Sequence, residues 1–193
     1  MSPKTDRPNL RSQLRTSTKS AHDALDATLG TLNLADRDEY CQFLHIQYAA
    51  RVPLEQWCAV YMPGHLMPPR QSGLIAQDLF SLGSSTDVQF PAFIPAADIE
   101  PLGIAWALGG SSMGNRTMLA RMRRHSGKGR PAAFLAGDAM QAFWGTIKPL
   151  LGQPVSDATT QRATRGAIAV FACFETAKTL NPTRITHPTR ITA

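Results

Sequence analysis

Apolar residues recur with a helical period along most of this chain, and this recurrence most limits the folds open to it. In the first such segment, Leu14, Thr18, His22, Leu25 and Leu29 follow one another at spacings of three and four, which places them on one face of a helix. Strand-type alternation is scarce. The pattern therefore predicts an all-α fold, built as a single multi-helical domain.

The order of the predicted helices follows from capping residues, prolines and glycines. Asp36 and Ser156 are expected N-caps, and Pro53 is expected to kink or break the second helix. We expect helices over residues 9–29, 37–63, 73–83, 101–125, 131–151 and 156–180. The domain spans 10–180, between a flexible arm (1–9) and a flexible tail (181–193) in which the sequence PTRIT occurs twice.

Composition narrows the class of protein. The chain is 43% hydrophobic, enough for a core, yet no apolar run approaches the roughly 20 residues of a membrane span, and no secretory signal is visible. Cys41, Cys58 and Cys173 form no CxxC pair, which favours reduced, buried thiols and a cytoplasmic location. The net charge of +6 includes a basic cluster at residues 121–130. The cluster lacks interleaved aromatics and lies at a helix C-terminus, so we expect no nucleic-acid partner.

His22 is the candidate metal ligand. It lies in the apolar face of the first helix, with Arg15 seven residues and Lys19 three residues before it. A buried histidine satisfied by a hydrogen bond is one interpretation, and the cations then form a solvated face. The other is a flat apolar ligand with a coordinating metal and an anionic rim, which fits haem and its propionates.

The segment Pro101 to Arg116 is predicted to be helical although it contains four glycines, each costing roughly 0.5–1 kcal/mol relative to alanine. Ala107, Gly110 and Gly114 share a face, with Ser111 beside them. Such a face permits either tight packing against another helix or close approach to a planar ligand.

Three segments resemble the bacterial haem oxygenase family, including the form found beside bacteriophytochromes. Leu14 to Asp26 (LRTSTKSAHDALD) is similar to the proximal-helix pattern Leu-Arg-x-x-Thr-x-x-x-His-x-x-Leu. Glu39 to Trp57 resembles the second helix, and Gly103 to Leu119 resembles the glycine-rich distal helix. The resemblance extends over about residues 10–180.

The resemblance implies a haem-oxygenase-like fold with haem between the proximal and distal helices, and O₂- and electron-dependent cleavage of haem to biliverdin, CO and ferrous iron. Haem is then both cofactor and substrate, an external ferredoxin or reductase supplies electrons, and a bacteriophytochrome is a candidate biliverdin acceptor. His22 matches the iron ligand. The implied catalytic positions are Gly110, Ser111, Gly114 and Asn115, and the implied haem contacts are His22, Arg15, Lys19, Ala107, Gly110 and Gly114.

The sequence departs from the family at Gly109, where many relatives have Glu, and at Asn115, which replaces a glycine. These departures motivate an alternative, a haem-binding or sensor protein of the same fold that does not degrade haem. A nucleic-acid binder acting through residues 121–130 is a third possibility. A thiamin-degrading enzyme with a cysteine nucleophile is a fourth, although none of the three cysteines has an activating neighbour in sequence.

Overall fold

The computed structural model describes residues 8–126 and 129–182. Within these ranges the chain is helical and forms no β-strand, as the apolar period predicted. The helices are α1 (Leu10–Ser17), α2 (Lys19–Leu29), α3 (Arg37–Tyr61), the 3₁₀ turn η1 (Gly64–Leu66), α4 (Ser72–Ser81), α5 (Pro101–Ser111), α6 (Asn115–Ser126), α7 (Ala133–Ala136), α8 (Ala139–Leu151) and α9 (Asp157–Leu180). Most of the predicted arm and tail lies outside the described residues.

Two helix starts confirm the predicted caps. The Asp36 carboxylate accepts hydrogen bonds from the backbone N–H groups of Asp38 and Glu39, at 2.9 and 3.0 Å. The Ser156 hydroxyl accepts one from the N–H of Thr159 at 3.2 Å. Both side chains satisfy donors that have no partner inside the helix.

The single helix predicted over residues 9–29 is wrong, because α1 and α2 are separated at Thr18. The Thr18 hydroxyl donates to the carbonyl of Leu14 at 2.8 Å, and its backbone departs from helical geometry, with φ −107° and ψ 3°. A threonine side chain that bonds the preceding turn competes with the regular ladder. The joint falls one turn before His22.

The helices predicted over 101–125 and 131–151 are also interrupted. After Ser111 the chain makes short-range turn bonds, Met113 N–H to the Gly110 carbonyl and Asn115 N–H to the Ser112 carbonyl, before α6 begins. The low helix propensity of the glycines accounts for this break. In the second case, Gly137 and Asp138 separate the short α7 from α8.

A kink or a break was expected at Pro53, and the break does not occur. The helix continues from Arg37 to Tyr61 although proline removes one N–H donor. Ala49, Ala50 and Leu54 around it are fully buried. Packing of these residues into the core outweighs the local cost of the proline.

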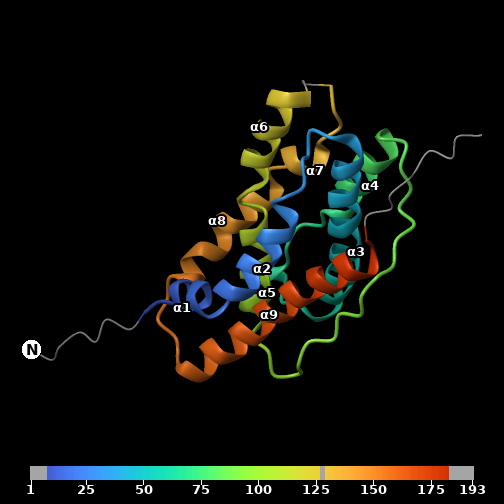
Figure 1. Cartoon of the computed structure of the whole chain (residues 1–193). Helices are drawn as coiled ribbons and strands as arrows, with labels where there is room; N and C mark the ends of the chain where they lie inside the picture. Colours follow the sequence, from blue (N-terminus) through green and yellow to red (C-terminus); the bar gives the residue numbers. More distant parts are fainter. Residues whose placement is uncertain (1–7, 127–128, 183–193) are drawn as a thin grey trace, which may run out of the picture.

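The helices form two adjoining cores. α9 packs against α1, α2, α3 and α5, and α5 also packs against α8. At the other end, α4 packs on α3, and α7 contacts α4 and α6. In Figure 1, α9 crosses the lower part of the molecule beside α1 and α2, and the irregular stretch 82–100 runs along the outside from α4 to α5. No helix in the described part of the chain is long and apolar enough to cross a bilayer.

The glycines of α5 serve different purposes. A Cβ on Gly103 would lie 1.9 Å from the carbonyl oxygen of Ala163, so α5 and α9 meet backbone to backbone at this point. A Cβ on Gly109 would lie 3.0 Å from Cε3 of Trp144 on α8. Tight helix packing therefore explains these two glycines. It does not explain Gly110, whose Cβ would make only an ordinary contact with Trp144, at 3.9 Å.

Candidate functional site

A cavity of about 190 Å³ lies where α1 and α2 face α5 and α8. Five of the residues singled out from the sequence line it: Arg15, His22, Ala107, Gly110 and Ser111. The remaining lining residues are Arg11, Trp106, Trp144 and Phe171. The fold thus brings the candidate histidine of the first segment opposite the small-residue face of α5.

His22 is half exposed, with 51% of its side chain open to solvent. Its Nδ1 lies 3.2 Å from the carboxylate of Asp26 on the next turn of α2, and its ring meets Phe171 edge to face at 5.9 Å. With Nδ1–H directed to the carboxylate, the lone pair is on Nε2. This is how metal-binding histidines are commonly oriented. Asp26 was not singled out in the sequence, although its spacing of four from His22 is a usable signal.

The α5 wall is open at Gly110. A Cβ at this position would meet only Cζ3 of Trp144, at 3.9 Å, so the space in front of Gly110 belongs to the cavity. Ala107, one turn earlier, is buried and adds a single methyl group. A flat ligand can therefore approach the backbone of α5 closely at these two residues.

The cations beside the cavity differ from the expected pair. Arg11 and Arg15 both line it, and the Arg11 guanidinium lies over the Trp144 ring, 5.7 Å from its centroid. Lys19 is 73% exposed, pairs with Asp23 one turn later, and is not among the lining residues. The spacing of four between Arg11 and Arg15 was a signal for this arrangement.

Gly114 and Asn115 do not line the cavity. Gly114 is in the exposed turn after α5, where a Cβ would contact the Met118 methyl at 3.4 Å. Asn115 was expected beside the distal pocket. Its side chain is instead 5% exposed and donates to the Phe134 carbonyl at 3.4 Å, in the core shared by α6 and α7.

Arg51 is a residue that the sequence reading missed. It lies on α3, is 3% exposed, and donates through Nη2 to the hydroxyl of Ser111 at 3.2 Å. Burial lowers its pKa to about 10, and the negative charge of Glu55 opposes that shift. An arginine in the otherwise apolar run YAARVP was the available signal.

The other described histidines lack this setting. His45 borders a hollow of about 560 Å³ between the start of α3 and the end of α9, but its Nε2 lies 3.0 Å from the Ser85 carbonyl oxygen. The Ser84 hydroxyl lies 3.2 Å from the same nitrogen, so Nε2 is already engaged by two neighbours in either tautomer. Within the described residues, no three His, Cys, Asp or Glu side chains gather to hold a metal ion.

The cysteines are poor candidates for nucleophiles. All three are buried and free. Burial raises the pKa of the Cys58 and Cys173 thiols to about 12 and also raises that of Cys41. A neutral thiol attacks slowly, so this chemistry weighs against the cysteine-enzyme alternative.

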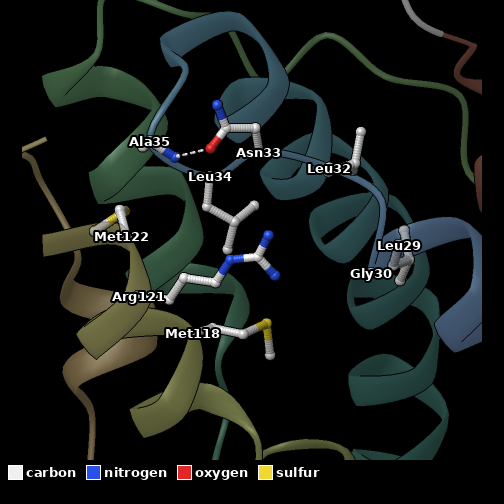
Figure 2. A pocket seen from close by; sticks show the side chains of 9 residues that line it. All are labelled: Leu29, Gly30, Leu32, Asn33, Leu34, Ala35, Met118, Arg121 and Met122. Carbon is white, nitrogen blue, oxygen red and sulfur yellow. Dashed lines mark hydrogen bonds between the residues drawn. The ribbon is translucent and has the colours of Figure 1, made fainter. Parts of the chain in front are cut away.

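A smaller cavity of about 60 Å³ lies between the end of α2, residues 30–35 and α6. Figure 2 shows the Arg121 side chain reaching from α6 into the space between Leu34 and Met118. A volume of this size holds about two water molecules. It is unsuited to a macrocycle.

Solved structures give an independent comparison of the fold. A haem oxygenase from Neisseria meningitidis, studied with NO and CO bound, superposes with a TM-score of 0.71 over 93% of this chain and 95% of that chain, at 17% identity. The chain has the fold of the bacterial haem oxygenases. Haem oxygenase-1 from the cyanobacterium Synechocystis, solved in complex with haem, gives 0.65 over 88% and 90% of the two chains, at 19% identity.

A third match, the haem oxygenase from Leptospira interrogans, gives a TM-score of 0.61 over 88% of this chain and 98% of that chain, at 16% identity. No protein-family model matches the chain, and no curated protein matches it in sequence. At these identities the structures establish the fold. The chemistry has to be argued from the site.

Proposed function

We propose that this protein is a haem oxygenase that binds haem between α2 and α5, with His22 as the axial ligand to iron. The observation that carries the proposal is the pair formed by His22 and Asp26, set across one cavity from Ala107 and Gly110. Haem supplies both the redox-active iron and the macrocycle that is opened to biliverdin, CO and ferrous iron, using O₂ and external electrons.

Asp26 orients the ligand. Its carboxylate oxygen lies 3.2 Å from Nδ1 of His22. By accepting a hydrogen bond from the Nδ1–H group, the carboxylate fixes the tautomer and the rotation of the His22 ring. It also makes Nε2 a better electron donor. Phe171 contacts the same ring from α9 and limits its movement.

Arg11 and Arg15 would hold the anionic rim of the ligand. Both guanidiniums lie on α1 at the edge of the cavity, one turn apart. Guanidinium groups pair well with carboxylates such as propionates. Trp106, Trp144 and Phe171 provide the apolar surface on which the ring system packs.

The α5 wall would control what reaches the other face. Ala107 and Gly110 leave space for a small molecule while excluding larger ones. Ser111 contributes a hydroxyl group at the same wall. Gly114 and Asn115, proposed from the sequence as catalytic, would act through the turn that follows α5, since neither lines the cavity.

The cavity must widen to accept a macrocycle, because about 190 Å³ is below the roughly 300–1,000 Å³ usual for ligand sites. The joint at Thr18 and the turn after Ser111 lie at the ends of the helices that form its two walls. Small rotations at these two joints separate α2 from α5.

The second candidate is a haem-binding protein that does not turn haem over. One feature favours it: at Gly109, where the family resemblance leads us to expect a glutamate, there is no side chain, and a Cβ would lie 3.0 Å from Cε3 of Trp144. Proton delivery at this wall would then depend on water, because the Ser111 hydroxyl already donates its proton to the Leu108 carbonyl. Under the leading proposal, the electron donor is an external ferredoxin or reductase, and a bacteriophytochrome is a candidate acceptor of biliverdin.

A turnover assay separates the two candidates. Purified protein is loaded with haem and given ascorbate or a ferredoxin–reductase pair under air. The oxygenase proposal expects loss of the Soret band, growth of the broad red biliverdin absorption, and one CO per haem. A Soret band that stays constant under air, with no CO released, would contradict enzymatic turnover and favour the binding protein.

A further inference from the structure

Arg51 has a buried positive charge with no acidic partner. Its side chain is 3% exposed, and it forms no ion pair within the described residues. The nearby carboxylate of Glu55 is engaged elsewhere, accepting the N–H groups of Gln71 and Ser72 at 2.6 and 3.0 Å. A buried cation with no hydrogen-bonded carboxylate is costly to fold, and the attraction of Glu55 only partly offsets the burial that lowers the pKa of Arg51, so a use for the charge is expected.

The guanidinium is held in one orientation. Nε donates to the side-chain oxygen of Gln47 and Nη2 to the hydroxyl of Ser111, both at 3.2 Å. The group also lies 5.2 Å from the ring centroid of Phe134 and 5.8 Å from that of Phe174. With its pKa at about 10, the group stays charged at neutral pH.

Ser111 links this charge to the cavity. Its hydroxyl proton is donated to the Leu108 carbonyl at 2.9 Å, and one of its two lone pairs accepts from Arg51. The remaining lone pair is available at the cavity wall that Ser111 lines. The hydroxyl can therefore accept a hydrogen bond from water in the cavity but has no proton left to donate.

We propose that Arg51 is a positioning residue that fixes Ser111 and gives the α5 side of the cavity a permanent positive field, so that the site prefers small anions to neutral ligands at the metal. The inference rests on the proposed haem function. Arg51 acts through its charge and not through the shape of the cavity, because its side chain does not line the cavity. The preference follows from Coulomb attraction between the guanidinium and an anion.

The test compares an anion with a neutral ligand. Azide and imidazole are titrated into the ferric haem complex of the wild type, Arg51→Met, Arg51→Lys and Ser111→Ala, with the Soret shift as readout. Arg51→Met is expected to weaken azide binding about tenfold and to change imidazole binding less than about twofold. Arg51→Lys, which keeps the charge, should retain azide affinity within about threefold. Arg124→Met, on the exposed end of α6, is the matched control and should change neither ligand.

If Arg51→Met does not fold, Ser111→Ala still tests the proposal. It leaves the charge in place but removes the acceptor for a cavity water whose other hydrogen can reach the anion, so azide binding should weaken by about threefold with imidazole binding unchanged. Equal changes for azide and imidazole, or none, in both Arg51→Met and Ser111→Ala would overturn the inference while leaving haem binding intact. Failure of the wild type to bind haem at His22 would overturn the proposed function and this inference with it.

Discussion

The carboxylate of Asp26 lies 3.2 Å from Nδ1 of His22, one turn earlier on α2. Neutralising this acceptor weakens the hydrogen bond that orients the ring, so Asp26→Asn is expected to lower haem affinity by about tenfold. In the ferrous protein the iron–histidine stretching frequency should fall, because a less basic imidazole binds iron more weakly. Haem titration and resonance Raman spectroscopy measure the two effects.

Asp23→Asn is the matched control for this pair. Asp23 is on the same helix and partners Lys19 rather than His22. Its substitution should leave both haem affinity and the iron–histidine frequency unchanged. The assignment of Asp26 is wrong if the two variants behave alike.

Arg15 and Lys19 lie one turn apart but are predicted to differ in function. Arg15 lines the cavity, whereas Lys19 is exposed and paired with Asp23. Arg15→Ala should weaken haem binding by about fivefold, a modest loss because exposed ion pairs are screened, and Lys19→Ala should have no effect. Repeating the titration with haem dimethyl ester, which lacks the carboxylates, should abolish the difference. A persistent difference with the ester would contradict a propionate contact.

We predict that the missing side chain at Gly110 leaves space for the ligand and is not required for packing against another helix. Because a Cβ there meets only Trp144 at 3.9 Å, a leucine side chain would fold into the cavity and fill it. Gly110→Leu should lower haem affinity by about tenfold or more. Its thermal midpoint should stay close to that of Gly145→Leu, a control at an α8 glycine whose Cβ would contact nothing within 4 Å. Equal haem affinity in the two variants would place the ligand elsewhere.

Asp78 gives the fold a predictable pH dependence. Its buried carboxylate accepts the N–H groups of Ala133 and Phe134 at 2.7 and 2.9 Å, yet burial outweighs these bonds and raises its pKa above the usual 3.8. The folded chain therefore binds this proton more tightly than the unfolded chain, so the contribution of Asp78 to stability falls as pH rises from 3.8 through the raised pKa.

Urea unfolding of the wild type and Asp78→Asn, from about pH 4 to about pH 7, tests the sign of this linkage. The free energy of unfolding of the wild type minus that of the variant should decrease as pH rises and then level off. A difference that grows with pH would mean that the backbone hydrogen bonds dominate and that the pKa is lowered.

The sequence predicted the helical class and two helix starts because these depend on local chemistry. The caps at Asp36 and Ser156 need nothing beyond neighbouring N–H groups. The interruptions at Thr18 and Gly137 were missed, and the kink or break expected at Pro53 is not a break. Each outcome depends on competition between a local cost and packing against other helices. The apolar period of the sequence does not show how strongly a residue packs against other helices.

Spacing within one helix was enough to predict which candidate residues share a face of that helix. His22 and Arg15 share a face, as do Ala107 and Gly110, and these four residues meet at the cavity. Asn115 was misplaced because the predicted long helix breaks after Ser111, which turns its side chain into the second core. Arg51 reaches Ser111 from 60 positions away along the chain, and only the fold, in which α3 and α5 both pack on α9, brings these two residues together.

Replacing His22 tests the central claim most directly. Wild type, His22→Ala and His45→Ala are loaded with ferric haem and compared by absorption and electron paramagnetic resonance spectra. We predict that His22→Ala loses the imidazole-type signature and regains it when free imidazole is added. His45→Ala, whose Nε2 is already engaged by the Ser85 carbonyl, should match the wild type. An unchanged imidazole-type spectrum in His22→Ala would contradict the account.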